Sequence, residues 1–233
     1  MEINGIHITV ERKTIKNLHL AVYPPDARVH VSSPEYLSEN DILSFVISKW
    51  GWVEKQREEI LTQARQTERE FISGESHYIL GTRYRLRVVE EPRVAHSVCR
   101  QKEWLIMTVQ PGTALHNKKE LLREFQRSEL KIILNKMVPR IAQSLNEQDV
   151  TWEIKLMKTQ WGSCIARKRH IILNLELARV PLNCIEYVVM HELTHLKVES
   201  HNKIFERLMN QRMPLWNSYR AELNKFIALP MNL

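Results

Sequence analysis

The stretch VVMHELTHLKVESHNKIF, residues 188–205, combines a helical apolar pattern with three histidines and a glutamate within eleven positions. Pro181 suits the first turn of a helix, and we expect this helix to run to about Val198. At about 100° per residue, five apolar side chains share one face of the helix, which we expect to be buried. They are Leu182, Ile185, Val189, Leu193 and Leu196.

His191 and His195 lie one turn apart on another side of this helix, so their imidazoles are directed to one point. With Glu192 they form the pattern HExxH, in which two neutral imidazoles bind one Zn²⁺ and the glutamate is general base for the zinc-bound water. A catalytic zinc needs a third protein ligand. His201 is the nearest candidate, because the chain can turn back after Ser200, which we expect to cap a following helix. The alternative third ligands are Glu199, Glu206 and Glu222.

The composition is that of an ordinary globular protein with 233 residues, 43% of them hydrophobic, and a formal net charge of +7. The basic groups are short and have glutamates between them, so we interpret the charge as a solubilising surface and not as a nucleic-acid interface.

No apolar run approaches the roughly 18 residues needed to cross a bilayer. The start, MEINGIHITVERKTIK, lacks the features of a secretory signal. We therefore expect a cytoplasmic protein with no membrane partner.

The cysteines do not suggest a disulfide framework or a thiolate metal cage. Cys99, Cys164 and Cys184 are odd in number and form no CxxC pair, which fits a reducing compartment. Because three histidines already complete a catalytic shell, we do not assign Cys164 to the metal.

The alternation of apolar residues predicts strands before residue 115 and mostly helices after it. The predicted strands cover residues 6–12, 18–24, 28–33, 77–90, 98–112, 151–158 and 170–178, with hairpins at 77–90 and 98–112. The predicted helices cover residues 38–66, 117–146 and 181–198 and most of the remaining C-terminal part. Ser38 is a plausible N-cap, and we expect Gly51 to weaken the first helix without ending it. The fold class is therefore α+β, with a β-rich part at residues 1–115 and a catalytic part at residues 116–233.

The region from Lys158 to about Trp216 resembles the YgjP-like metallopeptidase family, relatives of the SprT-like zinc proteases. The matching segments are WGSC (161–164), IILNLELARVP (171–181), YVVMHELTHL (187–196) and HNKIF (201–205). The resemblance implies a zincin-like metalloprotease domain with Zn²⁺ as cofactor. It also implies that His191, His195 and His201 are the zinc ligands and that Glu192 is the general base.

Two residues depart from the pattern of this family. Gln160 stands before WGSC where the family usually has a basic residue, and Glu206 follows Phe205 where an aromatic residue is usual. Because neither is an inferred metal ligand, they bear on substrate preference more than on chemistry.

The WGSC stretch has two interpretations. Trp161 and Gly162 can form a turn under the metal-binding helix, with Ser163 offering its hydroxyl to a substrate; the stretch can equally be a packing turn with an inert cysteine. A transition-state oxyanion needs a hydrogen-bond donor. The candidates for substrate binding are Lys158, Ser163 and Tyr219.

These patterns favour a zinc-dependent peptidase that acts on a peptide or protein substrate. The first alternative is a metal-dependent nucleoside-triphosphate pyrophosphatase of the UTP type, because the same activated water can attack phosphorus. No glycine-rich phosphate loop supports that alternative. The second is a zinc-stabilised binding module without enzymatic activity, in which Glu192 would have little purpose.

Overall fold

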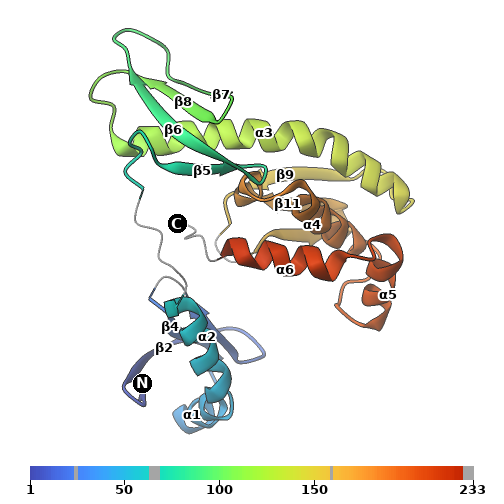
Figure 1. The fold of residues 1–233 in the computed structure, drawn as a ribbon. Coiled ribbons are helices and arrows are strands. Elements are labelled where there is room, and N and C mark those ends of the chain that lie inside the picture. Colours follow the sequence, from blue (N-terminus) through green and yellow to red (C-terminus); the bar gives the residue numbers. More distant parts are fainter. Residues whose placement is uncertain (24–25, 63–68, 158–159, 228–233) are drawn as a thin grey trace. The chain divides into compact units, whose positions relative to one another are not determined.

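The described residues divide into two compact units, 1–62 and 69–227, each with its own core (Figure 1). The structure is a computed structural model that describes residues 1–23, 26–62, 69–157 and 160–227. The class is α+β and the N-terminal part is rich in strands, as predicted. The predicted division at 115/116 falls inside the second unit, where helix α3 begins. Within the described residues, no helix is both long and apolar enough to cross a bilayer.

The first unit is a four-stranded sheet with two helices. Its elements are β1 (Glu2–Ile3), β2 (Ile6–Lys13), β3 (His19–Tyr23), β4 (Arg28–Pro34), α1 (Glu39–Ser48) and α2 (Trp50–Thr62). The strand order is β1-β2-β4-β3, and β2 and β4 are parallel. Val29 and Val31 of β4 pack with Val46 and Val53 of the helices in one buried cluster.

The single long helix expected after Ser38 is in fact two helices. Ser38 does cap α1, since its hydroxyl accepts a hydrogen bond from the Asp41 N–H. The helix is interrupted at Lys49, whose N–H bonds the carbonyl of Val46, three residues back. Such a bond tightens the last turn and ends the α-helical ladder. Gly51, the residue expected to weaken the helix, lies inside α2.

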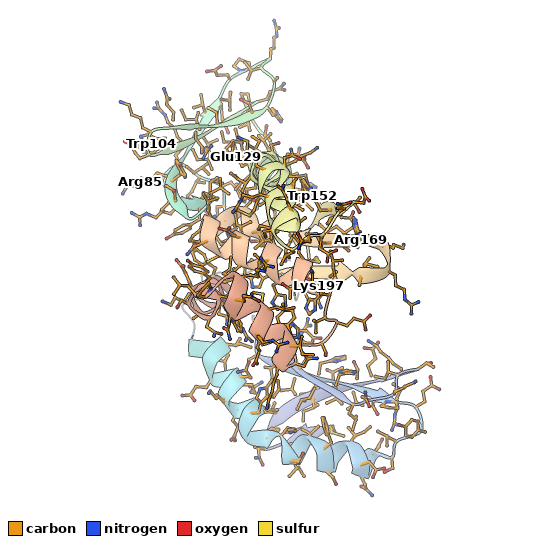
Figure 2. The ribbon with its side chains drawn as sticks, turned by 90° about the vertical axis from the view of Figure 1, so that its right-hand side faces the viewer. Arg85, Trp104, Glu129, Trp152, Arg169 and Lys197 are labelled. Carbon is orange, nitrogen blue, oxygen red and sulfur yellow. The ribbon has the colours of Figure 1, made fainter. Side chains whose placement is uncertain are left out.

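The second unit begins with a second four-stranded sheet and a long helix. Its elements are β5 (Ser76–Ile79), β6 (Thr82–Glu90), β7 (Ser97–Gln101), β8 (Trp104–Val109) and α3 (Leu115–Ser144). Both predicted hairpins are confirmed, and β6 and β8 pair in parallel to join them. An ion pair of 2.6 Å between Arg100 and Glu129 links β7 to α3, and Figure 2 shows Glu129 on that helix.

The remainder of the second unit is a three-stranded sheet with three helices. Its elements are β9 (Thr151–Lys155), β10 (Gly162–Ile165), β11 (His170–Asn174), the 3-10 helices η1 (Ala166–Lys168) and η2 (Leu175–Arg179), α4 (Leu182–Thr194), α5 (Lys203–Arg212) and α6 (Trp216–Ile227). The strand order is β10-β11-β9. The turn predicted at WGSC is wrong, because residues 162–165 pair with β11 and form the edge strand β10. This part of the chain, with α3, encloses the largest buried core.

The β5–β6 turn is hydrogen-bonded to the segment that leads into α4. The N–H of Leu80 bonds the Ala178 carbonyl at 2.7 Å, and the N–H of Gly81 bonds the Arg179 carbonyl at 3.2 Å. Gly81 has a φ of +81°, and a Cβ there would lie 2.8 Å from the Cα of Pro181. Only glycine meets both conditions without strain, so this turn fixes where α4 begins.

We predict that Gly81→Ala lowers the free energy of unfolding of the second unit by about 2 kcal/mol or more. The cost combines backbone strain at positive φ with displacement of Pro181. Gly74→Ala is the matched control, because Gly74 also has a positive φ but open space around it. Urea unfolding of both variants measures the difference. Equal costs for the two variants would show that the contact with Pro181 has no energetic weight.

Candidate metal centre

Helix α4 is buried over most of its surface. Its buried residues are Cys184, Ile185, Tyr187, Val188, Val189, Met190, Glu192, Leu193 and Thr194. The prediction that Leu182 is buried is wrong, because this first residue of the helix is 46% exposed. The helix also ends at Thr194, earlier than predicted. The N–H groups of Leu196 and Lys197 each bond a carbonyl three residues back, which closes the helix in a tight turn.

The chain after α4 folds back and brings His201 to the helix. Within this turn, the Nδ1–H of His195 donates a hydrogen bond of 3.0 Å to the Val198 carbonyl. Asn202 caps α5, because its side chain accepts from the N–H groups of Ile204 and Phe205. The prediction that Ser200 caps this helix is therefore wrong. An amide oxygen two residues later caps the helix instead.

The half-buried carboxylate of Glu147 fastens this turn to neighbouring segments. Glu147 is bonded to Arg169 at 2.6 Å and lies 3.7 Å from the ammonium of Lys197. Its side chain is only 11% exposed. Arg169 and Lys197 are labelled in Figure 2, on the segments before β11 and after α4. The turn is thus fastened to the end of α3 and to the loop before β11.

The three histidines converge on one point. The Nε2 atoms are separated by 3.3 Å (His191 to His195), 3.2 Å (His195 to His201) and 2.9 Å (His191 to His201). Nitrogen atoms bound tetrahedrally to zinc at about 2.0–2.1 Å lie about 3.3–3.4 Å apart. One ion can therefore contact all three nitrogens. The bond from His195 Nδ1 to a carbonyl leaves its Nε2 free of a proton, which is the ligand form.

The ring of Phe205 packs against all three histidine rings. Its ring centroid lies 4.9 Å from that of His191 and 4.8 Å from those of His195 and His201, and its side chain is 2% exposed. Burial, then the neighbouring imidazoles and Arg220, lowers the pKa of His191 to about 3. The histidine is thus kept neutral without a metal, and neutral imidazole is the form that binds metal ions.

Glu192 is enclosed between α4 and β10. Its side chain is buried, and a Cβ on Gly162 would lie 2.6 Å from its Oε1. Glycine at this position therefore makes the space for the carboxylate. Burial raises the pKa of Glu192 to about 8. Burial, and then the charge of Glu192, raises the pKa of the Cys164 thiol to about 11, so this thiol is protonated at neutral pH in the metal-free protein.

A pocket of about 610 Å³ opens over the histidines and Glu192. It is lined by residues 160–167, which include the whole of β10, and by side chains of α4 and α6. Ser163 lines this pocket, as the prediction of a substrate contact requires. Tyr219 packs against the core, and the pocket is lined by its neighbour Arg220 instead. Lys158 lies outside the described residues.

The alternative third ligands lie apart from the three imidazoles. Glu199 lines the pocket, Glu206 is exposed on α5, and Glu222 accepts a hydrogen bond from Asn183. Within the described residues, His191, His195 and His201 form the cluster of metal-ligating side chains close enough to share one ion.

Among the pocket residues that sequence reasoning did not assign to a site are Tyr187, Arg167 and Arg220. Tyr187 lies one turn before His191, so helical spacing could have identified it. Its ring contacts His191 edge-on at 5.8 Å and stacks on Trp216 at 6.2 Å. No sequence signal places Arg220, because its position depends on how α6 packs against α4.

Comparison with known proteins points to one family. The family model described as YgjP-like, metallopeptidase domain, matches residues 16–226. The metallopeptidase zymogen of Pyrococcus abyssi abylysin is similar over 42% of this chain and 98% of its own, with 18% identity and a TM-score of 0.39. The metallopeptidase zymogen of Methanocaldococcus jannaschii jannalysin is similar over 40% and 94%, with 23% identity and a TM-score of 0.36. No curated protein matches the chain.

We predict that the protein binds one transition-metal ion per chain and that His201→Ala weakens this binding by at least about 100-fold. Two imidazoles one helical turn apart remain in that variant, but the third donor is lost. His116→Ala, which removes an exposed histidine of α3, is the control and should bind as the wild type does. Calorimetric titration of metal-free protein measures the affinity. Equal affinities in the two variants would exclude His201 as a ligand.

Proposed function

We propose that this chain, which belongs to the YgjP-like metallopeptidase family, is a zinc-dependent peptidase with Glu192 as its general base. The observation that carries this proposal is the meeting of three imidazole Nε2 atoms, at most 3.3 Å apart, beside a buried carboxylate in an open pocket. Three protein ligands are typical of a catalytic zinc, whereas a structural zinc has four. This ligand number favours an enzyme over a zinc-stabilised binding module.

In this proposal His191, His195 and His201 hold the ion through Nε2. Zinc, when bound, supplies Lewis-acid polarisation of the scissile carbonyl and lowers the pKa of a water molecule. As general base, Glu192 would accept a proton from the attacking water at a carboxylate oxygen and would pass it to the leaving amine. Burial raises the pKa of this carboxyl without metal, and a nearby dication lowers it again.

The edge strand β10 gives the substrate a place to bind. It lines the pocket along its whole length and pairs on one side with β11. An extended peptide can add to such an edge through backbone hydrogen bonds. We propose that Ser163, on this strand, donates its hydroxyl to the substrate. Peptide binding along β10 brings a scissile bond past Glu192.

The nucleoside-triphosphate pyrophosphatase alternative shares the same metal centre. The observation in its favour is that Arg167 and Arg220 line the pocket and can bind anions. Against it, an extended edge strand suits a peptide better than a compact polyphosphate. Hydrolysis assays with zinc-loaded protein and nucleoside triphosphates, run beside the peptide assays, separate the two.

We predict that Glu192→Gln lowers kcat/KM on a quenched-fluorescence peptide library by about 100-fold or more. The variant keeps the shape of the side chain but cannot accept a proton. Its metal content, measured by mass spectrometry of the purified protein, should equal that of the wild type. Glu206→Gln removes an exposed carboxylate of α5 and is the matched control. Cleavage by Glu192→Gln at the wild-type rate would reject the mechanism.

A further inference from the structure

We propose that Arg167 and Arg220 form a carboxylate-binding subsite beside the metal centre, so that the preferred substrates are peptides with a carboxylate near the scissile bond. This inference rests on the proposed peptidase function and names its substrate class. The carboxylate is either an acidic side chain or a free C-terminus, since both present the same group.

The two arginines reach one pocket from different elements. Arg167 lies in η1, directly after β10, and Arg220 lies in α6. Both line the pocket that the three histidines and Glu192 also line. A peptide lying along β10 therefore passes the metal centre and meets guanidinium groups within the same cavity.

Two carboxylates of α6 and α4 are bonded to partners other than Arg220. On α6, Glu222 accepts a hydrogen bond of 2.8 Å from Asn183, and on α4, Glu186 is bonded to Arg140 at 2.7 Å. Within the part of the chain that the structure describes, Arg220 makes no hydrogen bond or ion pair. Its guanidinium donors are thus free for a ligand.

Arg167 is unpaired in the same way, in contrast to its neighbour. In the basic run 167–169, Arg169 is bonded to Glu147 at 2.6 Å and so helps to fasten the turn after α4. Arg167 is exposed and has no such partner among the described residues. The run therefore contains one arginine that stabilises the fold and one that faces the pocket.

The charge in the pocket favours an anion. Its carboxylates are Glu192, enclosed under Gly162, and Glu199; its cations are Arg167 and Arg220. A bound dication makes the sum positive, which attracts an anionic group into a concave site. Guanidinium binds carboxylate through two parallel hydrogen bonds, and such charge-assisted bonds are stronger than neutral ones.

Matched peptides test the proposal in the zinc-loaded protein. One arm compares Asp with Asn and Glu with Gln at each position flanking the scissile bond; a second compares a free C-terminus with its amide. We expect kcat/KM to be about tenfold or more higher for the carboxylate member in one of the arms. Arg167→Gln and Arg220→Gln should each reduce this ratio towards one, and Arg220→Lys should restore part of it.

Two lysines provide the controls. Lys168 lies in the same basic run as Arg167 and Lys225 lies on α6, but neither lines the pocket. Lys168→Gln and Lys225→Gln should therefore keep the wild-type ratio. Equal loss in these variants would mean that general surface charge, and not the subsite, sets the preference, and would overturn the proposal.

A binding measurement separates this inference from the peptidase proposal. Fluorescence anisotropy of labelled acidic and amide peptides on zinc-loaded Glu192→Gln reports the subsite without requiring cleavage. Tighter binding of the acidic peptide, lost in the Arg220→Gln background, supports the subsite even if no peptide is cleaved. Cleavage of all peptides with equal efficiency overturns the subsite and leaves the peptidase proposal standing. Arginine-dependent hydrolysis of nucleoside triphosphates without any carboxylate preference also overturns it.

Discussion

The convergence of three imidazoles is the constraint on which the rest of the second unit depends. His191 and His195 come from one helix, but His201 arrives only because the chain reverses directly after Thr194. The bond from His195 to the Val198 carbonyl and the half-buried carboxylate of Glu147 both fasten that reversal. Phe205 then fills the space below the three rings at nearly equal distances. Burial lowers the pKa of His191 and of His201, which favours the neutral, metal-binding form of these two imidazoles.

The second constraint is the close passage of β10 over Glu192. Burial raises the pKa of Glu192 to about 8, so burying the ionised carboxylate lowers the stability of the folded protein. Carboxylates with such strongly shifted pKa values are concentrated at functional sites. Gly162 is the residue that permits it, since any side chain there would occupy the space of the carboxylate. The same strand forms the edge of the sheet and one wall of the pocket. Proton transfer and substrate alignment would thus depend on a single short segment.

The sequence predicted most of the fold and the centre of the site, for identifiable reasons. Helical periodicity places His191, Glu192 and His195 correctly because the spacing of a helix is rigid. Alternation identified the strands of the first two sheets except the two-residue β1. It did not identify β10, because WGSC is short and contains glycine, and its pairing with β11 is a tertiary contact. Likewise Asn202, and not Ser200, caps α5 because the exact turn decides which oxygen meets the free N–H groups.

Residues that depend on packing between helices were beyond sequence reasoning. Tyr219 and Arg220 are adjacent on α6, and only the packing of α6 on α4 decides which one lines the pocket. Pairing of Arg220 also depends on tertiary packing, and within the described residues Glu186 and Glu222 are bonded to Arg140 and Asn183 instead.

X-ray absorption at the zinc edge of zinc-loaded protein tests the central claim most directly, because it reports which atoms surround the ion. We expect three imidazole nitrogens and an oxygen at about 2.0–2.1 Å. A sulfur neighbour at about 2.3 Å, or fewer than three imidazoles, would contradict it.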